Sequence, residues 1–178
     1  MAVDWVTVDE VYGSDRPLRI ELESQRQAYV LVRGGGRVWS VAVPEVVAHL
    51  GPDAWQRLRA GQGAKGPRMY DWARVELVQE APVGWRHWLL ARRSLKDASA
   101  LAYYRVFAPM ATTLAVMVQI AGRRWLIEEA IETAKGEVGL DQYEVRRWTG
   151  WYRRITLALP VYAYLAVRRA EGQADPKG

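Results

Sequence analysis

The sequence predicts an α/β protein on two observations. Short β-rich runs flank a helical segment near the N-terminus, and the last third of the chain is helical in pattern. Half of the 178 residues are apolar, which is enough to build a hydrophobic core and argues against disorder. A strand, a helix and a strand in close succession are typical of half of an α/β unit.

The N-terminal elements are marked by capping and turn residues. Residues 5–9 (WVTVD) predict a short strand that ends at Asp9. Asp15 is a favourable N-cap with a proline two positions later, and it predicts a helix that ends at about Arg26. Residues 29–32 (YVLV) predict a second, buried strand that ends at a glycine triplet.

The middle of the chain predicts a different pattern. Residues 46–58 predict a helix that is interrupted near Gly51, and residues 61–67 (GQGAKGP) predict a loop. The next segments suit an antiparallel meander of three strands: residues 69–78, 87–92 and 101–107.

The last part of the chain predicts helices from residue 112 onward. A loop is expected at residues 136–139, and a last helix over residues 145–169. We therefore expect four parts: residues 1–36 with the strand, helix and strand, an insertion over 37–110 with a helix and the meander, C-terminal helices over 111–170, and a flexible polar tail over 171–178.

The charge of the chain favours a polyanionic partner. The net charge is +5, and no Asp or Glu occurs between Val145 and Ala170. Three arginine doublets lie in this acid-free segment: Arg146 and Arg147, Arg153 and Arg154, and Arg168 and Arg169. We expect the first two doublets to contact DNA. For the neighbouring Trp148, Trp151 and Tyr152 two interpretations stay open, packing in a core or a place on a DNA-facing edge.

Composition also excludes several kinds of site. The chain has no Cys, hence no disulfide, thiolate metal site or Cys nucleophile. His49 and His87 are interpreted as a helix-surface residue and a strand residue, so a metal would be held by carboxylates and would be Mg²⁺ or Mn²⁺. No signal peptide is recognised, and the apolar run at 155–167 is too short to span a bilayer. We expect a cytoplasmic protein without a membrane partner.

The helix around residues 124–135 (RWLIEEAIETAK) carries a charged stripe. At about 100° per residue, Arg124, Glu128 and Lys135 fall within roughly 40° of one another. They lie at the margin of a predicted buried face that consists of Ile120, Ile127, Ile131 and Ala134. Glu129 is then expected to point into solvent. The stripe either keeps the helix flank soluble or forms a site, and an Arg placed four residues before a Glu is the poorer order for a stabilising pair.

These residues carry a resemblance to a known family. The spacing Arg124-x3-Glu128-x6-Lys135 matches the R-x3-E-x6-K part of the YREK signature of bacterial insertion-sequence transposases of the DDE superfamily. The signature begins with a Tyr, where this chain has Ala121. Four further segments resemble such transposases: residues 9–13 (DEVYG) the block with the second catalytic Asp, 63–72 (GAKGPRMYDW) the β-rich insertion, and 134–146 (AKGEVGLDQYEVR) and 148–153 (WTGWYR) the C-terminal half.

The resemblance covers most of the chain and implies a partial RNase H-like core with a β-rich antiparallel insertion. In this family two divalent metals, Mg²⁺ or Mn²⁺, are bound between two Asp and one Glu. One metal activates the attacking water or 3′-hydroxyl, and the other stabilises the leaving oxygen. The resemblance implies that Asp9 and Glu128 are catalytic metal ligands, and that Arg124 and Lys135 hold phosphates of insertion-sequence ends.

The first catalytic Asp of the family has no counterpart in this chain. It normally precedes the second by many tens of residues, and Asp4 lies in the same segment as Asp9 on the opposite pleat. We therefore expect a truncated DDE-type transposase that is inactive as this fragment and associates with DNA, with a second copy or with a full-length transposase. Two alternatives remain: a non-catalytic DNA- or transposase-binding remnant that acts as an inhibitor, and a pseudogene product without function.

Overall fold

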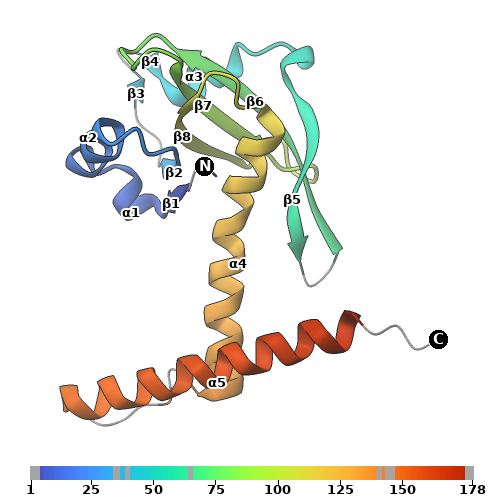
Figure 1. Ribbon diagram of the computed structural model, residues 1–178. Coiled ribbons are helices and arrows are strands. Elements are labelled where there is room, and N and C mark those ends of the chain that lie inside the picture. The colour runs from blue at the N-terminus through green and yellow to red at the C-terminus, as the bar shows by residue number, and fades with distance from the viewer. Residues whose placement is uncertain are drawn as a thin grey trace. The chain divides into compact units, whose positions relative to one another are not determined.

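The computed structural model describes residues 5–33, 37–38, 41–63, 66–139, 142 and 147–174. The chain divides into two compact units, Met1–Arg124 and Trp125–Gly178. The first unit holds a curled six-stranded mixed sheet with helices, and the second holds the end of α4 and all of α5 (Figure 1). The predicted α/β class is confirmed, while the RNase H-like core stays a prediction.

The strands and helices follow one another in an order close to the predicted one. The strands are β1 (Val6–Val8), β2 (Tyr29–Arg33), β3 (Arg37–Val38), β4 (Val41–Ala42), β5 (Gln56–Gly63), β6 (Gly66–Leu77), β7 (Trp85–Arg93) and β8 (Leu101–Pro109). The helices are α1 (Glu10–Gly13), α2 (Arg16–Ser24), α3 (Val43–Ala48), the 3-10 helix η1 (Pro52–Ala54), α4 (Leu114–Val138) and α5 (Trp148–Ala174).

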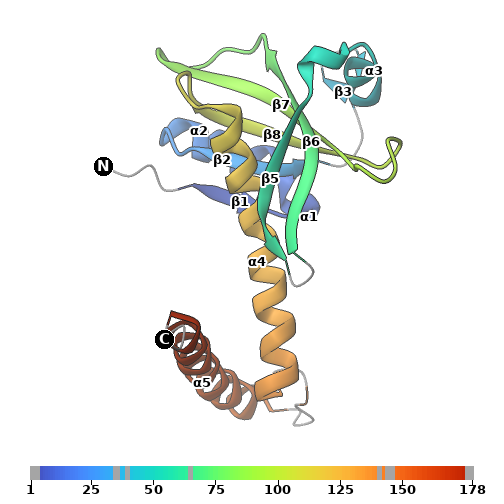
Figure 2. The same ribbon diagram turned by 90° about the vertical axis from the view of Figure 1, so that its right-hand side faces the viewer.

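One sheet joins the N-terminal strands to the predicted meander. Its order is β1-β2-β8-β7-β6-β5, in which β1 and β2 are parallel and every other neighbouring pair is antiparallel (Figure 2). The meander of β6, β7 and β8 is confirmed. Because β8 pairs with β2, with Phe107 opposite Tyr29, strands from residues 1–36 and 37–110 belong to the same sheet. The short strands β3 and β4 pair separately.

The sheet buries apolar side chains on both faces. On one face Leu22 of α2 packs against Tyr29, Leu31 and Phe107. Farther along the same face, α3 places Val43 and Val47 against side chains of β6 and β7. Alternation along the strands sends the intervening residues to the other face, where the fully buried side chains include Trp72, Leu90 and Val106.

The first half of α4 belongs to the second face of this sheet. Arg74, which alternates with Ala73 and so shares the face of Trp72, donates a hydrogen bond to the Thr112 carbonyl oxygen at 2.7 Å, just before α4 begins. Gly122 of α4 lies so close to β5 that a Cβ atom there would stand 1.5 Å from the Ala60 carbonyl oxygen. The start of α4 is therefore fixed against the sheet by close backbone contact.

Capping decides the position of α2, as predicted. The Asp15 carboxylate accepts a hydrogen bond from the Leu18 backbone N–H at 2.8 Å. This bond satisfies one of the donors that the first turn of a helix leaves unpaired. The helix covers residues Arg16–Ser24, slightly shorter than expected.

Two predictions for the middle of the chain are wrong. The predicted helix over 46–58 ends at Ala48, and Gln56–Gly63 forms the strand β5 instead. Local sequence was a poor guide there because β5 forms through its pairing with β6, in which Leu58 faces Tyr70. The predicted loop over 61–67 is shortened for the same reason. A register shift within β5 is accommodated by Gly61, whose φ of 144° favours glycine.

The C-terminal helices differ from the prediction at their ends. Helix α4 continues to Val138, so most of the loop predicted at 136–139 is helical. The residue that follows the helix, Gly139, has a left-handed φ of 59°, which is common after a helix. Helix α5 covers Trp148–Ala174 rather than 145–169 and contains the start of the predicted tail. Residues 175–178 lie outside the described residues. None of the helices described is both long enough and apolar enough to cross a membrane.

Candidate functional site

Asp9 stands at the end of a strand, where the sequence placed it. It follows β1, which occupies an end position in the described sheet rather than a central one. Its exposed carboxylate is the N-cap of α1 and accepts a hydrogen bond from the Tyr12 backbone N–H at 3.2 Å. Asp9 therefore has a structural role in this fold, whatever else it binds.

Glu128 and Lys135 are exposed on α4, whereas Arg124 is half-buried. The predicted burial of this helix is correct for Ile120 and Ala134 and wrong for Ile131, which is 47% exposed. Glu129, expected in solvent, is half-buried. The side chain of Ile127 lies outside the described residues.

The reason for these differences is that the first half of α4 buries a wider arc of its circumference than the second half. With Arg124 at zero on the helical wheel, Leu114, Met117 and Ala121 fall between roughly 20° and 80°, and all three are buried. Glu128 and Lys135 occupy the same angular range in the second half and are exposed. The charged stripe thus continues the side by which the first half packs on the sheet. A single amphipathic pattern could not describe such a helix.

The two predicted metal ligands belong to different units, Asp9 to the first and Glu128 to the second. The family resemblance implies that their carboxylates meet at one metal site, and this stays a prediction. Among the residues that the structure describes, no three His, Asp or Glu side chains are grouped so as to hold a metal ion. The Asp9 carboxylate is also engaged as a helix cap. The two-metal, three-carboxylate site that the family resemblance implies therefore stays a prediction.

The four arginines of the acid-free segment that are predicted to contact DNA fall into three groups. Arg147 and Arg153 are exposed at the start of α5. Arg154 is half-buried and donates a hydrogen bond to the Gly139 carbonyl oxygen at 2.7 Å, so it ties α5 to the residue that follows α4. Arg146 lies outside the described residues. Exposed cations for a polyanion are thus provided by Arg147 and Arg153.

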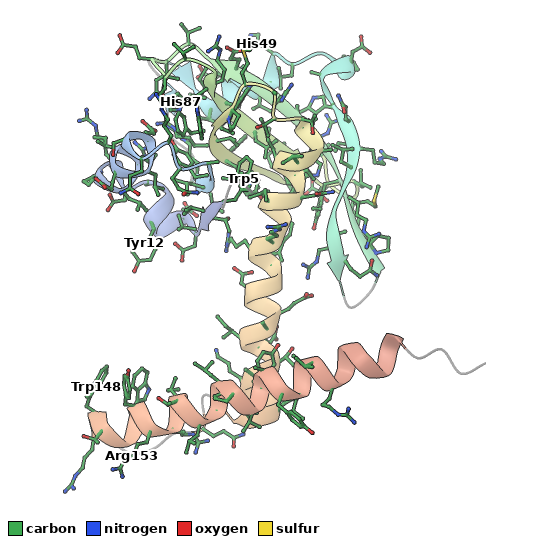
Figure 3. All side chains as sticks on the ribbon, in the orientation of Figure 1. Trp5, Tyr12, His49, His87, Trp148 and Arg153 are labelled. Carbon is green, nitrogen blue, oxygen red and sulfur yellow. The ribbon has the colours of Figure 1, made fainter. Side chains whose placement is uncertain are left out.

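Three aromatic side chains at the start of α5 form an exposed surface, which we call the aromatic shelf (Trp148, Trp151 and Tyr152). Arg147 directly precedes this shelf, whereas Arg153 lies on the opposite side of the helix. Trp148 is 71% exposed and Tyr152 60%. The rings of Trp148 and Trp151 are stacked, with centroids 4.9 Å apart and planes 21° from parallel. The interpretation of these residues as core is therefore wrong in this structure. Figure 3 shows Trp148 and Arg153 near the start of α5.

Sequence reasoning missed a polar cluster under α2. The Tyr29 hydroxyl donates a hydrogen bond to the Glu23 carboxylate at 2.5 Å, and His87 Nδ1 lies 4.0 Å from the same carboxylate. His87 is buried between α2 and the sheet and contacts the Phe107 ring (Figure 3). The sequence does contain a signal for this cluster. Arg105 and Phe107 are two positions apart in β8 and therefore lie on the same face of the strand, which places an arginine among apolar side chains.

Burial sets the ionisation of this cluster. It lowers the pKa of His87 by desolvating the charged form, and the Glu23 carboxylate partly opposes that effect. Burial likewise raises the pKa of the Tyr29 hydroxyl, reinforced by its bond to Glu23. The pKa of Arg105 is lowered by burial and by repulsion from Arg19. The cluster holds α2 to the sheet, and His49, on the C-terminal end of α3, is exposed and outside it.

Comparisons with known proteins assign no family and no function to this chain. The chain matches no protein-family model, no curated protein and no solved structure.

Proposed function

We propose that this chain is a DNA-binding protein of the insertion-sequence transposase type, and that these 178 residues bind DNA without cleaving it. The observation that supports DNA binding most directly is the start of α5. Arg147 and Arg153 are exposed there, in a segment without any Asp or Glu from Val145 to Ala170. Exposed cations in a segment without acids attract phosphates.

Binding of this kind has a measurable salt dependence. Each phosphate neutralised on duplex DNA releases counterions, so the logarithm of the binding constant falls with the logarithm of salt concentration by about 0.9 per contact. We expect weak binding to blunt duplex DNA, with little sequence preference and a steep fall between about 50 and 200 mM salt. Fluorescence anisotropy of a labelled duplex measures it.

Two variants locate the contact. The double substitution Arg147→Ala and Arg153→Ala should weaken binding and reduce the salt slope by about 2, because two phosphate contacts are lost. The double substitution Lys96→Ala and Arg16→Ala is the charge-matched control, since both are exposed cations of the other unit. A flat salt dependence of the unaltered protein, or equal losses in both variants, contradicts the proposal.

The transposase type rests on the spacing of Arg124, Glu128 and Lys135 and on the segments that surround it. Glu128 and Lys135 are exposed to solvent, so they are accessible to a metal and to DNA. Cleavage, however, needs two metals held about 4 Å apart by several carboxylates. The described residues group fewer than three such ligands, and we expect no nicking of labelled insertion-sequence ends with Mg²⁺ or Mn²⁺.

Measurements of metal binding separate a ligand role of Asp9 and Glu128 from the effects of these residues on the structure. Asp9→Asn keeps an oxygen that can cap α1 but removes the charge, and Glu128→Gln does the same on α4. If Asp9 and Glu128 share a weak metal site, both variants lose Mn²⁺ binding in calorimetry, whereas Glu132→Gln, an exposed neighbour, does not. Metal-dependent nicking that Glu128→Gln abolishes would show that cleavage does occur and overturn that half of the proposal.

A second candidate function is an inhibitor that binds a transposase or another copy of this chain. It is favoured by the apolar surface of α5, where the exposed side chains include Leu157, Leu159, Val161 and Val167. Surfaces of this kind mark protein contacts more often than free solvent faces. Sedimentation velocity over a range of concentrations tests self-association, and Leu157→Glu should abolish any dimer that forms.

A further inference from the structure

We propose that the aromatic shelf binds unpaired nucleic-acid bases by stacking, while Arg147, which directly precedes the shelf, contacts a phosphate that flanks them. This inference rests on the proposed DNA binding and adds a ligand to it: a single-stranded segment, or a strand end with unpaired bases. The proposal depends on three properties of the shelf, namely its ring geometry, its exposure and its charge.

The geometry is that of a stacking platform. Trp148 and Trp151 are one helical turn apart and their rings are nearly parallel at 4.9 Å, with the Tyr152 ring 6.3 Å from that of Trp148. The rings hold one another in place, and Trp148 remains 71% exposed. A flat, rigid aromatic surface of this kind can accept a base with little loss of side-chain freedom. Stacking tolerates any base, because every base has a π-face.

The surrounding charge selects nucleic acid over a protein partner. Arg147 directly precedes the shelf, Arg153 follows it on the opposite side of α5, and the segment from Val145 to Ala170 contains no Asp or Glu. A second copy of the chain would bring an equally cationic helix to the same surface, and like charges would repel. A nucleic-acid strand instead offers bases for the rings and a phosphate for the Arg147 guanidinium group.

Unpaired bases are required because a duplex hides its base faces. Inside B-form DNA each face is stacked on the neighbouring pair, so side chains reach only edges and backbone. Exposed aromatic rings therefore gain stacking energy from single strands, overhangs or frayed ends. The same arginines still contact a blunt duplex, and the two kinds of binding are separable by experiment.

The experiment compares three labelled ligands of equal length by fluorescence anisotropy with the full chain: an oligothymidine strand, a strand of abasic sites and a blunt duplex. The abasic strand carries the same phosphates without bases. We expect oligothymidine to bind about tenfold or more tighter than the abasic strand. In the double variant Trp148→Ala and Trp151→Ala that difference should disappear, with binding of the blunt duplex retained.

Two further variants act as controls. Tyr164→Ala removes another exposed aromatic ring from α5, 63% exposed and beyond the shelf along the helix, and should leave the preference intact. Trp148→Phe keeps an aromatic face and should preserve most of it. Equal binding of oligothymidine and the abasic strand by the unaltered protein overturns the inference and needs no variant that might misfold.

The outcomes separate this inference from the proposed function. If the abasic and thymidine strands bind equally but the duplex binds with a steep salt dependence, the shelf proposal fails and DNA binding stands. If no ligand binds, both fail. A concentration-dependent dimer that the double variant abolishes would assign the shelf to contact with a second copy, and it would also overturn the inference.

Discussion

The two units of this chain use apolar residues in opposite ways. The first unit buries large side chains such as Trp72, Tyr29 and Phe107 completely. In the second, the described side chains that are buried are those of Ala134 and Ala158, while Trp148, Leu157 and Tyr164 are exposed. A unit that leaves its large apolar residues in solvent gains little stability from them. The difference indicates that the first unit provides most of the stability of the fold, and it agrees with the binding role proposed for the second.

The largest expected effect tests this contrast directly. Phe107→Ala should cost about 3 to 5 kcal/mol of unfolding free energy, because it removes a fully buried ring that contacts Tyr29, Trp85 and His87. Leu157→Ala in α5 should change stability by less than about 0.5 kcal/mol, since that side chain is 70% exposed. Urea unfolding measures both. A large cost for Leu157→Ala would show that α5 is packed in solution and would break the comparison.

Alanine substitutions at two glycines of α4 should change the free energy of unfolding in opposite directions. Gly122→Ala places a methyl group 1.5 Å from the Ala60 carbonyl oxygen, so α4 or β5 must shift, at a cost of about 1 to 3 kcal/mol. Gly136→Ala meets nothing within 4 Å and should stabilise α4 by up to about 1 kcal/mol. Thermal unfolding of the pair sharpens the contrast between a packed and an open half of α4. Equal effects at both positions would contradict it.

A smaller effect is expected from pH, and only in the first unit. Burial lowers the pKa of His87, so between the folded and unfolded pKa values the unfolded chain binds more protons. Stability therefore rises with pH in this window, and it is lost as the pH falls below about 6.5. The groups that face His87 are Glu23, Arg19 and Arg105, with the Glu80 backbone.

The variant His87→Gln isolates this contribution. Between about pH 7.5 and pH 5.5 the unaltered protein should lose up to about 1.4 kcal/mol more than His87→Gln. The urea midpoint at each pH gives the difference. If both proteins lose the same amount, His87 is not responsible for the acid sensitivity, and the Glu23 carboxylate compensates the burial of the ring.

The smallest effects concern the two helix caps. Asp15→Ala should cost about 1 kcal/mol, because its 2.8 Å bond starts the nine-residue helix α2. Asp9→Ala should cost about 0.5 kcal/mol, since α1 has four residues and the bond is longer at 3.2 Å. Asn at either position should restore most of the loss. If Asp9→Ala costs more than Asp15→Ala, Asp9 has a further partner that the cap does not explain.

Several features follow from the sequence alone. Local capping chemistry determined α2, because an Asp side chain reaches the first turn of its own helix without help from the rest of the chain. A continuous run of β-favouring residues predicted β2, and the separations of three strand-like segments predicted the meander of β6, β7 and β8. The cationic character of α5 is a matter of composition, because the segment from Val145 to Ala170 contains arginines and no Asp or Glu. The spacing of Arg124, Glu128 and Lys135 is likewise a property of the sequence.

Other features depend on partners that are distant along the chain. Gln56–Gly63 is a strand only because β6 offers it a backbone to pair with, and no local propensity predicts that partner. The tertiary fold also decided that α4 buries a wider arc in its first half than in its second, that His87 is buried under α2, and that Trp148 is exposed. Capping and β-propensity act over a few residues, whereas strand pairing and burial join residues far apart in the chain. The sequence of a helix alone therefore does not determine which of its sides will be buried.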